Sequence, residues 1–198
     1  MGLIAEKSLW TYEEFCDVIG DDQKADLIDG IIYMASLDNT RANELFLWTV
    51  VLLRLYVEAK RAGKVYGSRV ALRLDKRNGP EPDILFIKKE RLHLIKRGHI
   101  AGPADLVMEI VSPESIERDY KKKRRQYQRF GVREYWIIDE IKERVVVLRL
   151  GTDGKFHRVY PKKGVLSSDV LPGFWLRPEW LWQEPLPVVL DVLAELLK

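Results

Sequence analysis

Residues 82–87 read Pro-Asp-Ile-Leu-Phe-Ile, and residues 105–111 read Asp-Leu-Val-Met-Glu-Ile-Val. Both runs predict short strands. Neither alternates cleanly between polar and apolar side chains outside its acid, which indicates interior strands covered on both faces. Asp83 heads the first strand and Glu109 lies inside the second. A carboxylate among Leu, Val, Met and Ile is unfavourable unless a cation or a hydrogen-bond donor meets it, so these two acids are the first candidates for a functional site.

The two acids can meet if their strands are neighbours. Side chains alternate between the faces of a strand, and strands in register would bring Asp83 and Glu109 to one point. Mg²⁺ takes oxygen ligands in a near-octahedral shell and keeps several waters. Two carboxylates, the Ile110 backbone carbonyl and water would therefore suit Mg²⁺, with Mn²⁺ as a substitute. Such a metal can polarise a phosphodiester and supply a more acidic water.

A cationic helix is expected directly after Glu109, over residues 118–130. Asp119, Lys123 and Tyr127 follow one another at i, i+4 and i+8 and share one face, which Gln126 flanks. Lys123 could pair with an acid of the strands, steady the attacking water or neutralise charge that develops on a phosphate. The basic residues on the rest of the helix could contact a nucleic-acid backbone: Lys121, Lys122, Arg124 and Arg125.

The remaining sequence supplies helices and strands around this centre. The first expected helix runs from Thr11, with Glu14 as its capping-box partner, to a stop at 20–22. The others are expected over 39–61 with a stop at Gly63, over 118–130 with a stop at Gly131, and over 186–197. The expected strands are 25–28 and 31–34 around an Asp29-Gly30 turn, then 65–75, 84–87, 106–111, 134–139, 144–150 and 155–160. This order predicts an α/β (α+β) fold, with a central mixed sheet flanked by helices and additional antiparallel strands after the core.

A length of 198 residues indicates one domain over 1–198. Its expected parts are an N-terminal helix, hairpin and long helix (8–62), a catalytic core (63–150), and C-terminal strands and a helix (151–198).

Composition indicates which partners and which cellular compartment to expect for the chain. The formal net charge is only +3, but residues 88–99 and 117–133 are locally basic, which suits a polyanion. Cys16 is the single cysteine, so no disulfide framework within the chain is possible and a reducing compartment is expected. Residues 1–7 lack the apolar core of a signal peptide, and no apolar run reaches membrane-spanning length. We therefore expect a soluble cytoplasmic protein with no membrane partner.

Each candidate also has a plainer explanation. Asp83 follows a proline and could simply close a turn, and a basic helix face is often only a solvated one. Glu109 could form a structural ion pair with Lys123 or with an arginine. The histidines are scattered, which argues against a histidine-based metal site: His93, His99 and His157.

Taken together, the motifs resemble the Uma2 family, a group formerly of unknown function that is similar to the PD-(D/E)XK restriction-endonuclease-like superfamily. The resemblance covers nearly the whole chain. It rests on Asp26-Leu-Ile-Asp-Gly30, Pro82-Asp-Ile-Leu-Phe86, Asp105-Leu-Val-Met-Glu-Ile-Val-Ser-Pro113, the spacing of Asp119, Lys123 and Tyr127, Gly131-Val-Arg-Glu-Tyr-Trp-Ile-Ile-Asp139, and Leu171-Pro-Gly-Phe174.

The resemblance implies a restriction-endonuclease-like core and metal-dependent phosphodiester hydrolysis. It implies that Asp83 is the motif aspartate and Glu109 the second acid. The superfamily lysine usually lies two residues after that acid, where this chain has Val111. In the family the lysine lies on the following helix, at a place that Lys123 matches. Asp26 matches an acidic position in the first strand.

Three functions stay open at this point. The first is a Mg²⁺-dependent DNA endonuclease, with a homodimer expected by family analogy because two sites cut a duplex more readily than one. The second is a nucleic-acid-binding protein of the same fold that cleaves little or nothing, an alternative that Val111 and Asp26 keep open. The third is a structural or assembly module whose acids only form ion pairs with the basic helix.

Overall fold

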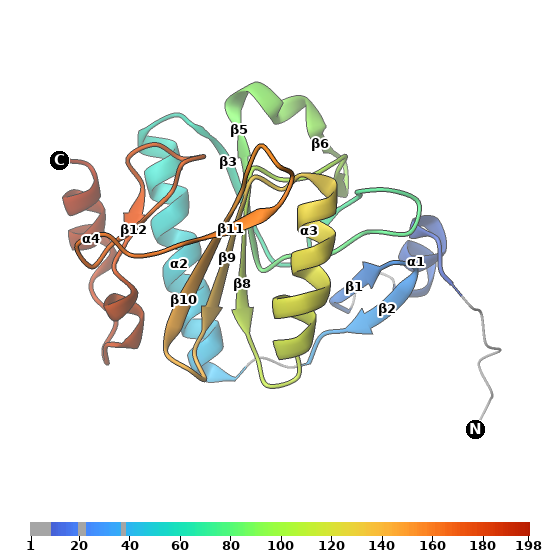
Figure 1. The fold of residues 1–198 in the computed structure, drawn as a ribbon, viewed down its shortest axis with the longest axis horizontal. Coiled ribbons are helices and arrows are strands. Elements are labelled where there is room, and N and C mark those ends of the chain that lie inside the picture. The colour runs from blue at the N-terminus through green and yellow to red at the C-terminus, as the bar shows by residue number, and fades with distance from the viewer. Residues whose placement is uncertain (1–8, 20–22, 37–38) are drawn as a thin grey trace.

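The computed structural model describes residues 9–19, 23–36 and 39–198. Its centre is a six-stranded mixed sheet in the order β11-β10-β9-β8-β5-β3 (Figure 1). β8 and β9 run parallel, and the other neighbouring pairs are antiparallel. The strands are β3 (Gly63–Gly67), β5 (Ile84–Lys88), β8 (Leu106–Val111), β9 (Glu134–Asp139), β10 (Arg144–Leu150) and β11 (Phe156–Val159). The predicted fold class and the predicted interior position of β8 are confirmed.

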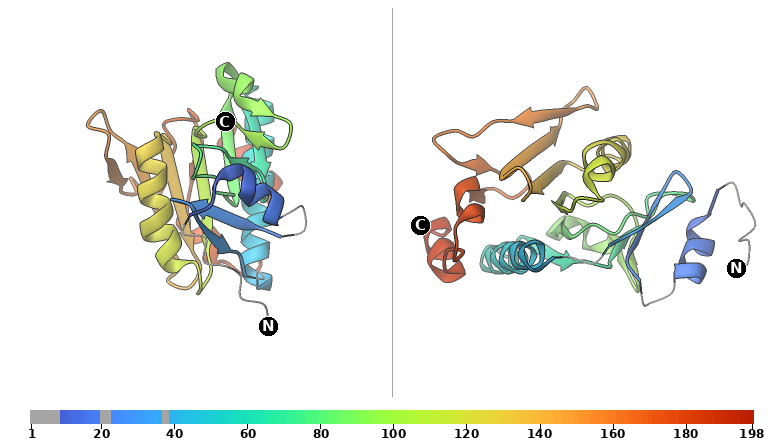
Figure 2. Two further views of the ribbon diagram at one scale, coloured as in Figure 1. Left: turned by 90° about the vertical axis from the view of Figure 1, so that its right-hand side faces the viewer. Right: turned by 90° about the horizontal axis from the view of Figure 1, so that it is seen from below.

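Helices cover both faces of this sheet (Figure 2). α2 (Thr40–Ala59) packs on one face, where Leu52, Phe86 and Trp136 belong to one buried apolar cluster. On the other face lies α3 (Arg124–Phe130), over a second apolar cluster. α4 (Val189–Leu196) packs beside α2. In the described part of the chain, no helix combines the length and the apolar character that a membrane crossing needs.

The described part of the N-terminal segment packs beside α3 and the loop before β5. α1 (Tyr12–Ile19) begins with the expected capping box, in which the Thr11 and Glu14 side chains accept each other's backbone N–H groups. β1 (Ala25–Ile28) and β2 (Ile31–Met34) form the expected hairpin around the Asp29-Gly30 turn, where φ is 51° and 80°. Leu27 and Gly79 exchange backbone hydrogen bonds of 3.1 and 2.9 Å, which hold β1 beside the loop before β5. The predicted helix stop at 20–22, like the segment 1–7, lies outside the described residues.

Short elements complete the chain. They are β4 (Ala71–Leu72), β6 (Ile95–Lys96) and β7 (His99–Ile100) in a small sheet, the 3-10 helices η1 (Lys89–Leu94) and η3 (Pro178–Trp182), and the ribbon of β12 (Leu166–Ser167) with β13 (Trp175–Leu176).

Several predicted boundaries are wrong, including the start of the C-terminal helix, which lies at Val189 and not at 186. The strand expected over 65–75 is divided between β3 and β4, which lie in different sheets, because the backbone turns at Arg69, where φ is 73°. The long helix ends at Ala59, before Gly63, because Arg61 takes the left-handed conformation with φ 50°. Gly63 instead opens β3.

The helix expected over 118–130 is present, but its first part is widened. Residues Arg118–Lys123 (η2) form a π-helical turn, and α3 continues from there to the predicted stop at Gly131, where φ is 82°. The Tyr135 hydroxyl, on β9, donates to the Asp119 carbonyl at 3.1 Å. A side chain that engages a helix carbonyl disturbs the regular hydrogen-bond ladder.

Candidate active site

The two acids singled out in the sequence meet on one face of the sheet. Ile84 pairs with Met108 in the antiparallel register of β5 and β8, so Asp83 and Glu109 occupy the next positions along. The Asp83 N–H donates to Glu109 Oε2 at 3.3 Å, and the Ile110 N–H donates to Asp83 Oδ2 at 2.7 Å. The strand register thus brings both carboxylates together. The Ile110 carbonyl as a metal ligand stays a prediction.

Lys123 reaches these acids from the helix. Its Nζ atom lies 2.9 Å from Glu109 Oε1, 3.1 Å from Asp26 Oδ2 and 3.9 Å from Asp119 Oδ1. The side chain is only 3% exposed. Tyr127 donates its hydroxyl to Glu109 Oε1 at 2.6 Å. The ion pair expected under the plainer explanation of Glu109 is therefore present, within a larger cluster of acids.

The other acids are held by separate donors. Asp26 accepts a hydrogen bond of 2.9 Å from the Glu81 N–H, and its second oxygen lies 3.4 Å from Arg118 Nε. Asp119 accepts a hydrogen bond of 2.5 Å from the Ser115 hydroxyl. Three of the four predicted acids thus lie within 4 Å of Lys123, and Asp83 lies beside Glu109.

Gln126 flanks the helix face that carries Lys123, but it bonds to β1 and to the loop before β5 and not to the acids. Its amide nitrogen donates to the Leu27 carbonyl at 3.1 Å and to Asn78 Oδ1 at 2.7 Å. Gln126 therefore fastens the β1–β2 hairpin to α3, and so supports the site through β1, which carries Asp26.

Sequence reasoning missed several residues of the site. Lys24 forms an ion pair with Asp83 through Oδ1, and Arg118, Ser115 and Glu81 contact the acids as described above. Lys24 precedes Asp26 by two residues in an extended segment, and side chains two apart in such a segment share a face. That alternation was the signal that could have identified Lys24.

The pKa values of the two central acids, Glu109 and Asp83, are shifted in opposite directions. Burial raises the pKa of Glu109, and the neighbouring carboxylates of Asp83 and Asp119 add to this against the opposing effect of Lys123. Burial alone would also raise the pKa of Asp83, but Lys24 and Lys123 hold it below its ordinary value. An excess of buried negative charge is thus concentrated around Glu109, and such a site favours an added cation.

The space between these side chains is small. Asp83, Glu109, Ile110 and Lys123 help to line a cavity of about 30 Å³, which admits a water-sized or ion-sized guest. Across the described ranges, no group of three or more His, Cys, Asp or Glu side chains is arranged to hold a metal. Mg²⁺ commonly uses one or two carboxylates with waters and substrate phosphates, so the pair Asp83 and Glu109 fits this ion.

The sequence profile of the Uma2 family, described as "Putative restriction endonuclease", matches residues 11–179. The chain belongs to the Uma2 family. It is also similar to the solved structure of a "putative nuclease belonging to DUF820 from Anabaena variabilis ATCC 29413", with a TM-score of 0.72 and 19% identity, over 87% of this chain and 97% of that one. At this identity the likeness shows the fold alone. No curated protein matches the chain.

Val111, two residues after Glu109, lies in the apolar core of this Uma2 chain. Val111 is fully buried in the cluster beneath α3, beside Tyr127 and Tyr135. A lysine there would have to bury its charge among apolar side chains. Lys123 brings an ammonium group to Glu109 from the following helix.

The four basic residues that are predicted to contact nucleic acid differ in their solvent exposure. Lys121, Arg124 and Arg125 are exposed, whereas Lys122 is half-buried and donates to the Tyr33 hydroxyl at 2.9 Å. Their contact with a nucleic-acid backbone stays a prediction.

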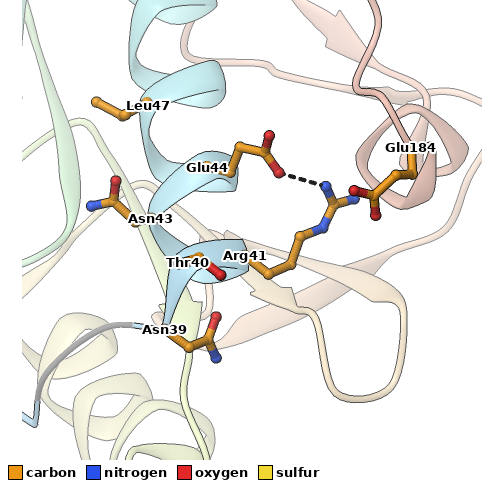
Figure 3. Close-up of a pocket in the computed structure, with 7 residues that line it drawn as sticks. All are labelled: Asn39, Thr40, Arg41, Asn43, Glu44, Leu47 and Glu184. Atoms are coloured by element: carbon orange, nitrogen blue, oxygen red, sulfur yellow. Dashed lines mark hydrogen bonds and ion pairs between the residues drawn. The ribbon is translucent and has the colours of Figure 1, made fainter.

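A wider pocket of about 810 Å³ lies at the start of α2 (Figure 3). Its charged lining residues are Arg41, Glu44 and Glu184, and Arg41 forms an ion pair of 2.9 Å with Glu44. None of the predicted site residues lines it. The two carboxylates outnumber the single cation, so this pocket is a poor site for phosphate.

We expect the metal-free Uma2 protein to lose stability as the pH rises from about 5 to 8. The pKa of Glu109 is raised from 4.5 to about 8 in the folded state, so folding favours the protonated acid. That contribution is complete below the unfolded pKa and is lost as the pH rises through the folded one, at up to about 1.4 kcal/mol per pH unit for one proton. Asp83, whose pKa is lowered, would change the stability only at lower pH.

Urea unfolding in EDTA across this pH range measures the slope. Glu109→Gln should reduce the slope most clearly above pH 7, because the raised pKa values of Glu81, about 7, and of Asp119, about 6, add to it at lower pH. A slope above pH 7 that survives the substitution would assign the effect to other groups. Mg²⁺ should stabilise the wild type more at pH 8 than at pH 6, because a ligating carboxylate must first lose its proton.

Proposed function

We propose that this chain is a Mg²⁺-dependent DNA endonuclease that hydrolyses phosphodiester bonds at a PD-(D/E)XK-like site with a relocated lysine. The observation that carries the proposal is the convergence of Asp83 and Glu109, from adjacent strands, beside the buried ammonium group of Lys123. Membership of a family described as restriction endonucleases supports a nucleic-acid substrate.

Each residue has a separate role in this proposal. Asp83, Glu109 and the Ile110 carbonyl would hold Mg²⁺ or Mn²⁺. When bound, the metal would polarise the phosphate and make a bound water more acidic. Lys123 fixes the position of Glu109 and offsets negative charge as the phosphate reacts. Asp26 holds Lys123 in place, and Tyr127 fixes the orientation of Glu109 through its hydroxyl.

The substrate would be held mainly through its backbone. Lys121, Lys122, Arg124 and Arg125 can neutralise phosphates, so binding should weaken as the salt concentration rises. A homodimer would present two such sites to the two strands of a duplex.

A second candidate function follows from the buried Val111. A chain that has lost the usual lysine could keep the fold and bind nucleic acid without cleaving it. The ion pairs of Lys123 would then serve stability alone.

The deciding experiment is cleavage of supercoiled plasmid and of single-stranded DNA by the wild-type chain. Mg²⁺ and Mn²⁺ should support cleavage, and EDTA should stop it. Binding to either DNA without cleavage in any metal would favour the second candidate. Neither binding nor cleavage would leave a structural role for the ion-paired acids.

A further inference from the structure

Two lysines meet the acids of the proposed active site, and they differ in how firmly they are held. Lys123 is 3% exposed and lies within 4 Å of three carboxylates. Lys24 is 23% exposed, and among the described residues Asp83 is the acid with which it forms an ion pair. Lys123 is thus an integral part of the buried cluster, whereas Lys24 lies at its solvent side.

The contact of Lys24 uses an oxygen of Asp83 that would also be available to a metal. Asp83 has two carboxylate oxygens, and Oδ2 already accepts the Ile110 N–H at 2.7 Å. Lys24 takes the other oxygen, Oδ1, with its ammonium group. An ammonium group and a divalent cation cannot share one oxygen at close range without strong repulsion.

We propose that Lys24 is a displaceable counter-ion, which neutralises Asp83 when no metal is bound and leaves Asp83 Oδ1 when a divalent cation enters. This inference rests on the proposed endonuclease function and adds a positioning residue to it. In the metal-free protein Lys24 neutralises the Asp83 carboxylate and holds it in place beside Glu109.

The structure favours Lys24 over its neighbours for this role. Its partial exposure lets the released ammonium group regain water, which a fully buried lysine could not do. It lies just before β1, where the Ala35 N–H donates to the Lys24 carbonyl at 2.9 Å, so the backbone stays fixed while the long side chain moves. Arg118, the other cation at this side, pairs with Asp26 instead.

Displacement predicts that Lys24 weakens metal binding. Mn²⁺ affinity, measured by electron paramagnetic resonance of free Mn²⁺ and by calorimetry, should rise about tenfold in Lys24→Met. Lys24→Arg keeps a competing cation and should bind Mn²⁺ nearly as the wild type does. Arg118→Gln removes a cation from the same cavity without freeing Asp83, so its gain should be clearly smaller.

The outcomes separate the two proposals. Unchanged or weaker Mn²⁺ binding by Lys24→Met would overturn the displaceable counter-ion and leave the endonuclease intact. An equal gain in Arg118→Gln would also overturn it, because a general charge effect would then suffice. Absence of Mn²⁺ binding in the wild type and in every variant would remove both the counter-ion and the metal-dependent site.

A measurement on the unaltered chain is independent of how the variants fold. Acetylation of individual lysines, followed by mass spectrometry with and without Mg²⁺, reports how free each ammonium group is. Lys24 should react several-fold faster with Mg²⁺, whereas the exposed Lys121 should not change. Equal reactivity of Lys24 in both conditions would overturn the proposal.

Discussion

Replacing Lys123 by methionine is expected to lower the free energy of unfolding by about 3–5 kcal/mol at neutral pH. The lysine is 3% exposed and lies 2.9 Å from Glu109 and 3.1 Å from Asp26. Methionine keeps most of the apolar volume but removes the cation that the buried Asp26 carboxylate and Glu109 share. Urea unfolding of the variant beside the wild type measures the loss.

Two comparisons separate lost charge from lost packing. Lys121→Met makes the same change at an exposed position of the same helix and should stay within about 0.5 kcal/mol of the wild type. The loss in Lys123→Met should shrink at acidic pH, where the acids can take up protons, and should shrink in the double variant with Glu109→Gln. A Lys123→Met protein as stable as the wild type would show that the lysine is not the counter-ion of this cluster.

The sequence predicted the centre of the fold because its signals there are local. The apolar runs around Ile84 and Leu106 identified two interior strands, and side-chain alternation correctly placed Asp83 and Glu109 on one face. The spacing of Asp119 and Lys123 likewise indicated one helix face, which the structure turns towards the acids.

The rest of the site depends on contacts between segments that are distant in the chain. Lys24 and Asp83 are 59 residues apart, and the hairpin docking that joins them needs Gln126 and Gly79 in their folded positions. The widened turn at Asp119 accepts a hydrogen bond from a hydroxyl on β9, a contact that no pattern within the helix reveals. Pairwise packing of this kind leaves no periodic trace in the sequence, so the acids could be predicted but most of their donors could not.

The other large effect is expected from Asp83→Asn, which should reduce metal-dependent DNA cleavage by about 10³-fold or more. A metal that polarises a phosphoryl oxygen supplies several kcal/mol of stabilisation to charge in the transition state, and each 1.4 kcal/mol corresponds to a factor of ten in rate. Asparagine has nearly the same shape, and its carbonyl oxygen can still accept the Ile110 N–H. It lacks the charge that would hold the cation.

The fold should survive this change, because Lys24 is 23% exposed and can be solvated when its partner is neutral. Asp105→Asn is a matched control. Asp105 is a buried aspartate at the opposite end of β8, where it accepts hydrogen bonds of 2.9 Å from the Lys88 N–H and from Arg91. Cleavage per folded molecule should be kept in this control and lost in Asp83→Asn, with circular dichroism and urea unfolding as checks on both. Full cleavage by Asp83→Asn would mean that phosphodiester hydrolysis does not use the carboxylate pair, and the active site would have to lie elsewhere in the chain.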